Sequence, residues 1–154
     1  MSKIFYIMGK SSSGKDTIYK KIREKLPQLK RITPYTTRPI REGETDGVEY
    51  FFVDEEGEEA GREYHFVDEK VFQKFREQGR IIESRTYHTV YGPWIYFTAD
   101  DGQIDLQKYD YLVIGTLESY YGMREYFGEE QLIPIYIEVE DGLRLERALC
   151  RERQ

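Results

Sequence analysis

The chain has 154 residues and a formal net charge of −6, and 39% of its residues are hydrophobic. This length and apolar content predict one folded domain with its own core. The acidic balance argues against a nucleic-acid partner, because such partners select basic surfaces. Cys150 is the single cysteine and no zinc-type spacing occurs, so a cytoplasmic location is the simplest expectation. The first apolar run is too short for an export signal or membrane span, so no membrane partner is expected.

The first 27 residues predict a strand, a glycine-rich loop and a helix. Residues 3–8 (KIFYIM) form a β-branched and aromatic run that stops at Gly9. Apolar residues then recur every four positions on one helical face, and Pro27 ends that pattern. A strand followed by a loop and a helix is the setting that a phosphate-binding loop requires.

The loop itself fits the pattern G-x-x-x-x-G-K from Gly9 to Lys15. In such a loop, glycines allow backbone N–H groups to surround an anion at the positive end of a helix, and the lysine reaches the β- and γ-phosphates. The residues expected to bind ATP are Gly9, Lys10, Ser11, Ser12, Ser13, Gly14, Lys15, Asp16 and Thr17. The alternatives are a helix-capping turn, or a loop that binds nucleotide without catalysing transfer.

The position after the lysine departs from the usual pattern. A serine or threonine normally binds Mg²⁺ there, whereas this chain has Asp16 followed by Thr17. A carboxylate is also a suitable ligand, because hard cations prefer oxygen. We therefore expect Asp16 and Thr17 to serve a magnesium ion.

The second half of the chain predicts βαβ units. Residues 109–114 and 133–139 have the composition of buried strands, and a helical stretch at 117–127 lies between them. This order favours an α/β fold with a mainly parallel sheet flanked by helices. An arginine-rich helix is expected from Leu143 onward, and a helical core at 71–76.

One segment of the middle region is repeated. Residues 47–55 (GVEYFFVDE) recur 14 residues later as residues 61–69 (GREYHFVDE), with seven of nine positions identical. A repeat present only twice does not indicate a solenoid. We interpret it as a tandem duplication that lengthens a surface hairpin.

Motifs beyond the loop resemble those of the guanylate kinase family. They are T-T-R-x-x-R-x-G-E-x-x-G-x-x-Y from Thr36 to Tyr50, an I-I-E segment at 81–83, a Y-G pair at 91–92, and arginines at 147 and 151. The resemblance implies a P-loop kinase with a core at about 1–33 and 98–141, a monophosphate-binding insert at about 34–97 and a partial lid at about 142–154. Family members continue through more of the lid and further elements.

The resemblance also implies roles for individual residues. The acceptor phosphate would be held by guanidinium and phenol groups, which suit a dianion. The acceptor-binding residues implied are Arg38, Arg41, Tyr50, Glu83, Tyr91 and Gly92, with Glu83 accepting from the guanine N1 and N2 hydrogens. The catalytic residues implied are Lys15, Arg38, Arg147 and Arg151.

Several positions depart from the family pattern. Pro34 and Pro93 stand where hydroxyl residues are expected, and Thr116 falls where the family has an Asp-Ile-Asp motif. Because of the repeat, either Tyr50 or Tyr64 can fill the phosphate-facing position, and the unbroken motif before Tyr50 favours that residue.

The predicted function is ATP-dependent phosphorylation of a nucleoside monophosphate, with GMP or dGMP as the acceptor, ATP and Mg²⁺ as cofactors and small-molecule nucleotides as partners. The alternatives are a catalytically inactive guanylate-kinase-like binding module and a monophosphate kinase with a different base specificity. A P-loop GTPase lacks support, because the chain contains no N-K-x-D motif.

Overall fold

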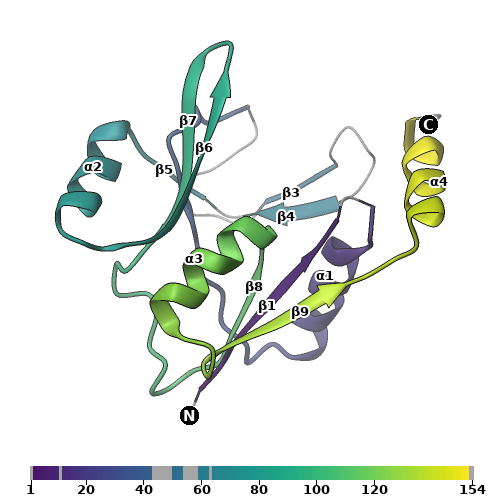
Figure 1. Ribbon diagram of the computed structural model, residues 1–154, viewed down its shortest axis with the longest axis horizontal. Helices are drawn as coiled ribbons and strands as arrows, with labels where there is room; N and C mark the ends of the chain where they lie inside the picture. The colour runs from purple at the N-terminus through teal and green to yellow at the C-terminus, as the bar shows by residue number, and fades with distance from the viewer. Residues whose placement is uncertain (1, 11, 43–49, 54–58, 63, 153–154) are drawn as a thin grey trace.

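The protein is built around a three-stranded parallel sheet (Figure 1), described here from a computed structural model that covers residues 2–10, 12–42, 50–53, 59–62 and 64–152. Strand β1 (Ile4–Gly9) lies between β8 (Tyr111–Ile114) and β9 (Leu132–Ile137). Ile4 is opposite Tyr111 on one side and Leu132 on the other. The predicted α/β class with a mainly parallel sheet is thus confirmed for these strands.

Two helices cover the faces of this parallel sheet. Helix α1 (Lys15–Lys25) follows the glycine-rich loop and contacts β1 and β8. Helix α3 (Leu117–Phe127) connects β8 to β9 and lies on the opposite face, in front of the sheet in Figure 1. Its N-cap is Thr116, whose hydroxyl accepts a hydrogen bond from the Ser119 N–H.

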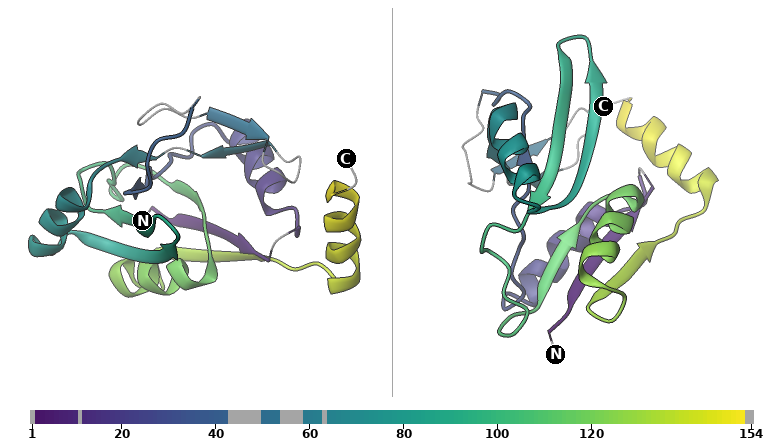
Figure 2. Two further views of the ribbon diagram at one scale, coloured as in Figure 1. Left: turned by 90° about the horizontal axis from the view of Figure 1, so that it is seen from above. Right: turned by 60° about the vertical axis from the view of Figure 1, so that its left-hand side comes forward.

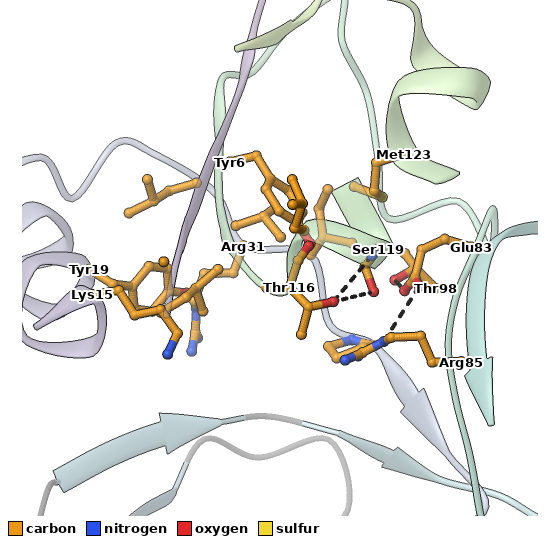
Figure 3. Close-up of a pocket in the computed structure, with 18 of the residues that line it drawn as sticks. Tyr6, Lys15, Tyr19, Arg31, Glu83, Arg85, Thr98, Thr116, Ser119 and Met123 are labelled. Carbon is orange, nitrogen blue, oxygen red and sulfur yellow. Dashed lines mark hydrogen bonds and ion pairs between the residues drawn. The ribbon is translucent and has the colours of Figure 1, made fainter. Parts of the chain in front are cut away.

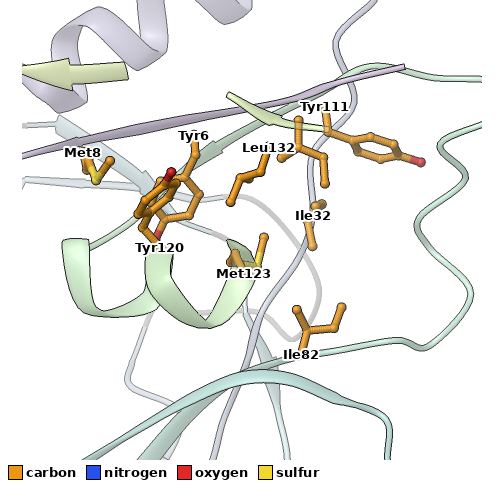
Figure 4. Close-up of a cluster of buried hydrophobic side chains, with 9 residues drawn as sticks. Tyr6, Met8, Ile32, Ile82, Tyr111, Tyr120, Met123 and Leu132 are labelled. Atoms are coloured by element: carbon orange, nitrogen blue, oxygen red, sulfur yellow. The ribbon is translucent and has the colours of Figure 1, made fainter. Parts of the chain in front are cut away.

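The main core fills the space between the parallel sheet and α3 (Figure 4). Its members are buried apolar side chains from β1, β8, β9 and α3, joined by Ile32 from the segment between α1 and residue 35 and by Ile82 from a second sheet. They are Ile4, Tyr6, Met8, Ile32, Ile82, Tyr111, Tyr120, Met123 and Leu132. Because Ile82 belongs to this cluster, the two sheets share one apolar core.

A second, four-stranded sheet has the order β5-β2-β7-β6. Its strands are β5 (His65–Phe66), β2 (Tyr35–Thr36), β7 (Gly92–Ala99) and β6 (Ile81–Thr89). The β6–β7 pair is antiparallel and projects from the molecule as a long hairpin (Figure 1). The sequence pattern did not predict these strands, which lie in the segment assigned to an insert.

Helix α2 (Glu69–Glu77) packs on this second sheet. Phe72 from the helix joins Ile95, Phe97 and Ala99 from β7 in a smaller buried cluster. The helix begins at Asp68, whose carboxylate accepts from the Val71 N–H.

The first copy of the repeat supplies one strand of an antiparallel hairpin. Its strand β3 (Tyr50–Val53) pairs with β4 (Glu59–Arg62), with Tyr50 opposite Arg62. The second copy continues from β4 into β5 and the start of α2. The duplicated residues therefore occupy different strands in the two copies.

The last element is α4 (Asp141–Glu152), which follows β9 and stands beside the sheet (Figure 2). It begins two residues before the helix expected from Leu143. None of the described helices combines the length and apolar character needed to cross a bilayer.

Candidate functional site

A cavity of about 380 Å³ lies between the parallel sheet and the second sheet. Lys15, Tyr19 and Arg31 line one side of it, and Glu83, Arg85 and Thr98 line the other (Figure 3). Thr116 and Ser119, at the start of α3, lie between the two groups. The fold thus brings the glycine-rich loop and the predicted base-reading carboxylate to one cavity.

The glycine-rich loop contains a left-handed glycine, as expected for Gly14, and also a left-handed serine. Gly14 has φ of +87° and Ser12 has φ of +63°, so both occupy the left-handed region. A Cβ at Gly9 would lie 2.7 Å from Ser13 Oγ, which requires glycine at the end of β1. Ser13 Oγ is buried and has no hydrogen-bond partner within the described part of the chain. An unpaired buried hydroxyl in this loop suits an anionic ligand that accepts from it.

Lys15 begins α1 and lines the cavity. Its Nζ lies 3.9 Å from Asp16 Oδ2, and both side chains are half-buried. Thr17 is exposed in the next position of the helix. Lys10 points elsewhere and forms an ion pair of 3.8 Å with Asp141 at the start of α4, while Ser11 lies outside the described residues.

The two arginines of α4 reach back to the glycine-rich loop. Arg147 Nη1 donates to the Ser12 carbonyl oxygen at 3.3 Å, and Arg151 donates to Ser12 Oγ. The residues are four apart and therefore share one helical face. The structure thus brings both predicted lid arginines to the loop expected to hold ATP.

Glu83 is the buried carboxylate of the cavity. It comes from β6 and is only 9% exposed. Its Oε1 accepts from the Thr98 hydroxyl at 2.9 Å, and its Oε2 lies 3.8 Å from Arg85 Nε. Within the described residues, neither Oε2 nor Arg85 Nε has a hydrogen-bond partner.

The environment of Glu83 shifts its ionisation. Burial raises the pKa of Glu83, while the Arg85 charge and the Thr98 and Ser119 hydroxyls act in the opposite direction and the Glu118 charge adds to the rise. The neighbouring phenol of Tyr6 also has a raised pKa, mainly because it is buried. Tyr6 therefore stays neutral and donates to the Thr116 carbonyl oxygen at 2.9 Å.

Arg38 is buried just after β2, with 5% of its surface exposed. Its Nη1 donates to the Pro39 carbonyl oxygen at 3.3 Å, and its guanidinium lies 5.3 Å from the centre of the Phe66 ring. The neighbouring Arg41 is exposed. Neither arginine contributes to the described lining of the cavity.

Tyr91 and Gly92, which were predicted to bind the acceptor, lie at the turn between β6 and β7. Tyr91 is 83% exposed and stacks on Trp94, with a ring separation of 6.3 Å. Gly92 begins β7 with φ of +105°, a conformation that favours glycine. The described cavity lining includes neither Tyr91 nor Gly92.

Tyr64, from the second copy of the repeat, contributes to the cavity. Tyr64 is buried, lines the cavity, and packs edge-on against Tyr96 at 5.7 Å. Tyr50 begins β3, and its side chain lies outside the described part of the structure. Of the two tyrosines of the repeat, Tyr64 is therefore the one whose described side chain lines the cavity.

Several polar groups of the cavity were not identified from sequence. Arg85, Thr98 and Ser119 surround Glu83, and Arg31 lines the wall opposite. Arg85 follows Glu83 by two positions, and a strand places such residues on one face. The spacing of two therefore places Arg85 beside Glu83 once β6 is known to be a strand. The proximity of Thr98 and Ser119 to Glu83 depends on contacts between distant segments.

No group of three His, Cys, Asp or Glu side chains within the described residues is arranged to hold a metal. A magnesium ion bound with a nucleotide needs fewer protein ligands, because it retains waters and phosphate oxygens. Asp16, next to Lys15 in the first turn of α1, fits that requirement.

Comparison with known proteins identifies relatives of one kind. Residues 1–57 match the family model described as guanylate kinase. A guanylate kinase from Thermobifida fusca is 49% identical over 49 residues, which are 32% of this chain and 25% of that protein. One from Mycobacterium bovis is 32% identical over 88 residues, or 57% of this chain and 36% of that protein. The matches thus span about a quarter to a third of the relatives' length.

The fold comparison extends over nearly the whole chain. The crystal structure of guanylate kinase from Anaplasma phagocytophilum aligns with a TM-score of 0.60 and 22% sequence identity. The alignment covers 99% of this chain and 71% of that one.

Proposed function

Because this chain belongs to the guanylate kinase family, we propose that it is an ATP-dependent kinase that phosphorylates GMP or dGMP. The observation that carries the proposal is the shared cavity, which has Lys15 of the glycine-rich loop on one wall and the buried Glu83 on the other. A donor nucleotide and an acceptor base can therefore be held by residues that face the same space.

In the proposed reaction, an oxygen of the acceptor monophosphate forms a bond to the γ-phosphorus while the bond from that phosphorus to the bridging oxygen of ADP breaks. Phosphoryl transfer needs alignment of these oxygens and compensation of the negative charge. Lys15 supplies a cation at the loop, and Arg147 and Arg151 supply two more from α4. Arg38 and Arg41, on the segment after β2, are proposed to hold the acceptor phosphate with Tyr64 or Tyr50.

Asp16 and Thr17 are the residues proposed to serve Mg²⁺. When bound, the ion would neutralise charge on the phosphate oxygens. Asp16 also lies 3.9 Å from Lys15 Nζ, so its carboxylate helps to position that ammonium group.

Glu83 is proposed to recognise the base. A buried ionised carboxylate accepts hydrogen bonds and donates none, so it selects a base edge with N–H groups. Guanine presents two such groups, at N1 and N2. Pro34 also lines the cavity but has no side-chain hydrogen-bond donor, so its side chain cannot donate to the base.

A coupled assay of ADP formation with GMP, dGMP, AMP, CMP and UMP tests the proposal. We expect turnover that depends on the acceptor and is fastest with GMP or dGMP. Preference for another base would support the different-specificity alternative. Retained ATP binding without turnover of any acceptor would support the binding-module alternative and contradict the proposal.

A further inference from the structure

The β6 strand places a buried donor beside a buried acceptor. Arg85 follows Glu83 by two positions, and both side chains line the cavity. Arg85 Nε and Glu83 Oε2 are 3.8 Å apart, which is too far for a hydrogen bond, and neither has another partner in the described structure. A ligand edge that carries an acceptor next to a donor satisfies both atoms.

Arg85 is held in this position by aromatic residues of the same sheet. Its Nη1 donates to Tyr87 Oη at 3.3 Å, and its guanidinium lies 5.8 Å from the centre of the Tyr96 ring. These contacts use the far end of the guanidinium. Neither contact uses Nε, which is buried beside Glu83 Oε2, and the Arg85 side chain as a whole lines the cavity.

Glu83 can accept from more than one donor. Its Oε1 already accepts a hydrogen bond from the Thr98 hydroxyl, but each carboxylate oxygen has two lone pairs. Guanine presents a carbonyl oxygen at C6 followed by N–H groups at N1 and N2, which give one acceptor and two donors in a row. Hypoxanthine lacks the second donor, and adenine replaces the carbonyl with an amino group.

We propose that Arg85 is a specificity-determining residue that donates to the C6 carbonyl oxygen of the guanine base while Glu83 accepts from the adjacent N–H groups. This inference rests on the proposed function and assigns the acceptor to the 6-oxopurine monophosphates, with GMP preferred to IMP. A site with buried polar groups rejects ligands that leave those groups unpaired. Arg85 therefore compensates for the absence of a donor at Pro34.

The experiment compares GMP with 6-thio-GMP, in which a weakly accepting sulfur replaces the C6 oxygen, and with IMP, which lacks the N2 amino group. The enzymes are the wild type and the variants Arg85→Ala, Arg85→Lys and Thr86→Ala. Thr86 is an exposed neighbour on β6 that does not line the cavity, so it provides a matched control. Thermal melts check that each variant is folded.

For Arg85→Ala we expect kcat/KM with GMP to fall about 10- to 100-fold, as for a lost charge-assisted hydrogen bond. The value with 6-thio-GMP should fall much less, so the ratio between these acceptors approaches one, while the preference for GMP over IMP persists. Equal losses with GMP and 6-thio-GMP would overturn the proposal. Full restoration of the ratio by Arg85→Lys would also overturn it, because a point charge would then suffice.

Calorimetric binding of GMP and 6-thio-GMP without ATP separates this inference from the proposed function. If the wild type transfers no phosphate, the kinase proposal fails, but the binding comparison still tests Arg85. Weaker binding of GMP by Arg85→Ala, with little change for 6-thio-GMP, supports the assignment. Equal affinities of the wild type and Arg85→Ala for GMP, or no binding of GMP by the wild type, overturn it.

Discussion

Glu83 is buried, yet the role proposed for it requires an ionised carboxylate that accepts hydrogen bonds from the base. Its raised pKa, caused first by burial, means that protonation occurs at a higher pH than for an ordinary glutamate. We expect kcat/KM for GMP to decline as the pH falls through this raised value. Glu83→Gln should lower kcat/KM and remove the decline, as measured in pH profiles of both enzymes.

The same shift affects stability with a defined sign. A group whose pKa is higher in the folded state favours folding below its unfolded pKa, and this contribution is lost as the pH rises through the folded value. Glu83→Gln should therefore gain stability relative to the wild type as the pH increases from acid to neutral.

The pH profile of kcat/KM also gives the outcome that would contradict the kinetic prediction. If the decline of kcat/KM at low pH is unchanged in Glu83→Gln, another group causes that decline and the role proposed for Glu83 is contradicted.

Tyr64 lines the cavity, whereas the side chain of Tyr50 lies outside the described residues, so we propose Tyr64 for the phosphate-facing position. Tyr64→Phe keeps the ring that packs on Tyr96 but removes the hydroxyl. We expect the KM for GMP to rise about 10-fold, the effect of one lost hydrogen bond to a charged group, with a smaller change for Tyr50→Phe. Steady-state kinetics of both variants decide between them, and a larger effect at Tyr50 would return the role to the first copy of the repeat.

Helix α3 links the parallel sheet to Glu83 through a close approach at Gly122. A Cβ at that position would lie 2.8 Å from Glu83 Cβ, so the helix and β6 depend on glycine there. Gly122→Ala should separate them, raise the KM for GMP and lower stability by about 1–3 kcal/mol, the usual cost of overpacking. Kinetics with GMP and thermal unfolding measure the two effects.

Gly142→Ala is the matched control for that variant. Gly142 is also helical, but among the described residues a Cβ there would meet only Glu140 Oε1, at 3.8 Å. Helix propensity then predicts unchanged or slightly increased stability. If Gly122→Ala behaves like this control, α3 does not position Glu83.

Helix α4 contributes charge to the glycine-rich loop through Arg147 and Arg151. Arg147→Ala should lower kcat about 10- to 100-fold, as expected for the loss of a charged group that stabilises the transition state, and leave the KM for GMP nearly unchanged. Glu146→Ala, at an exposed position of the same helix, serves as the control. A loss confined to the KM for GMP would place Arg147 with the acceptor instead.

The parts of the fold that were predicted from sequence are those with strong local signals. The range predicted for α3 agrees with its observed bounds of Leu117–Phe127, because a capping threonine and a following glycine delimit it. The strands of the parallel sheet were recognised because they are runs of mainly apolar residues, although only β1 is largely buried and alternate residues of β9 are exposed. Strands β6 and β7 were missed, since exposed polar and aromatic residues interrupt their alternation.

The candidate site was predictable where a motif defines it locally. Lys15 and Glu83 were both identified, and both line the cavity. Thr98 was not, because its contact with Glu83 depends on the pairing of β6 with β7. Tyr91, by contrast, was predicted from its motif to bind the acceptor, but the motif did not reveal that Tyr91 lies at an exposed turn of the β6–β7 hairpin.

At the scale of the whole molecule, the cavity exists because two sheets of different topology share one core. The parallel sheet supplies the glycine-rich loop, and the second sheet supplies Glu83 and Arg85. Ile82, next to Glu83, is buried in the cluster formed by the parallel sheet and α3. Packing of the core therefore fixes the position of β6, which carries Glu83, relative to the loop.

The fate of the γ-phosphate in a mixture of ATP, Mg²⁺ and GMP tests the central claim most directly, and phosphorus NMR can follow it. We predict that ADP and GDP form in equal amounts, and that Lys15→Ala lowers the rate by at least about 100-fold, as for other electrostatic catalytic groups. Formation of ADP with free phosphate and no GDP, or no consumption of ATP, would contradict the account.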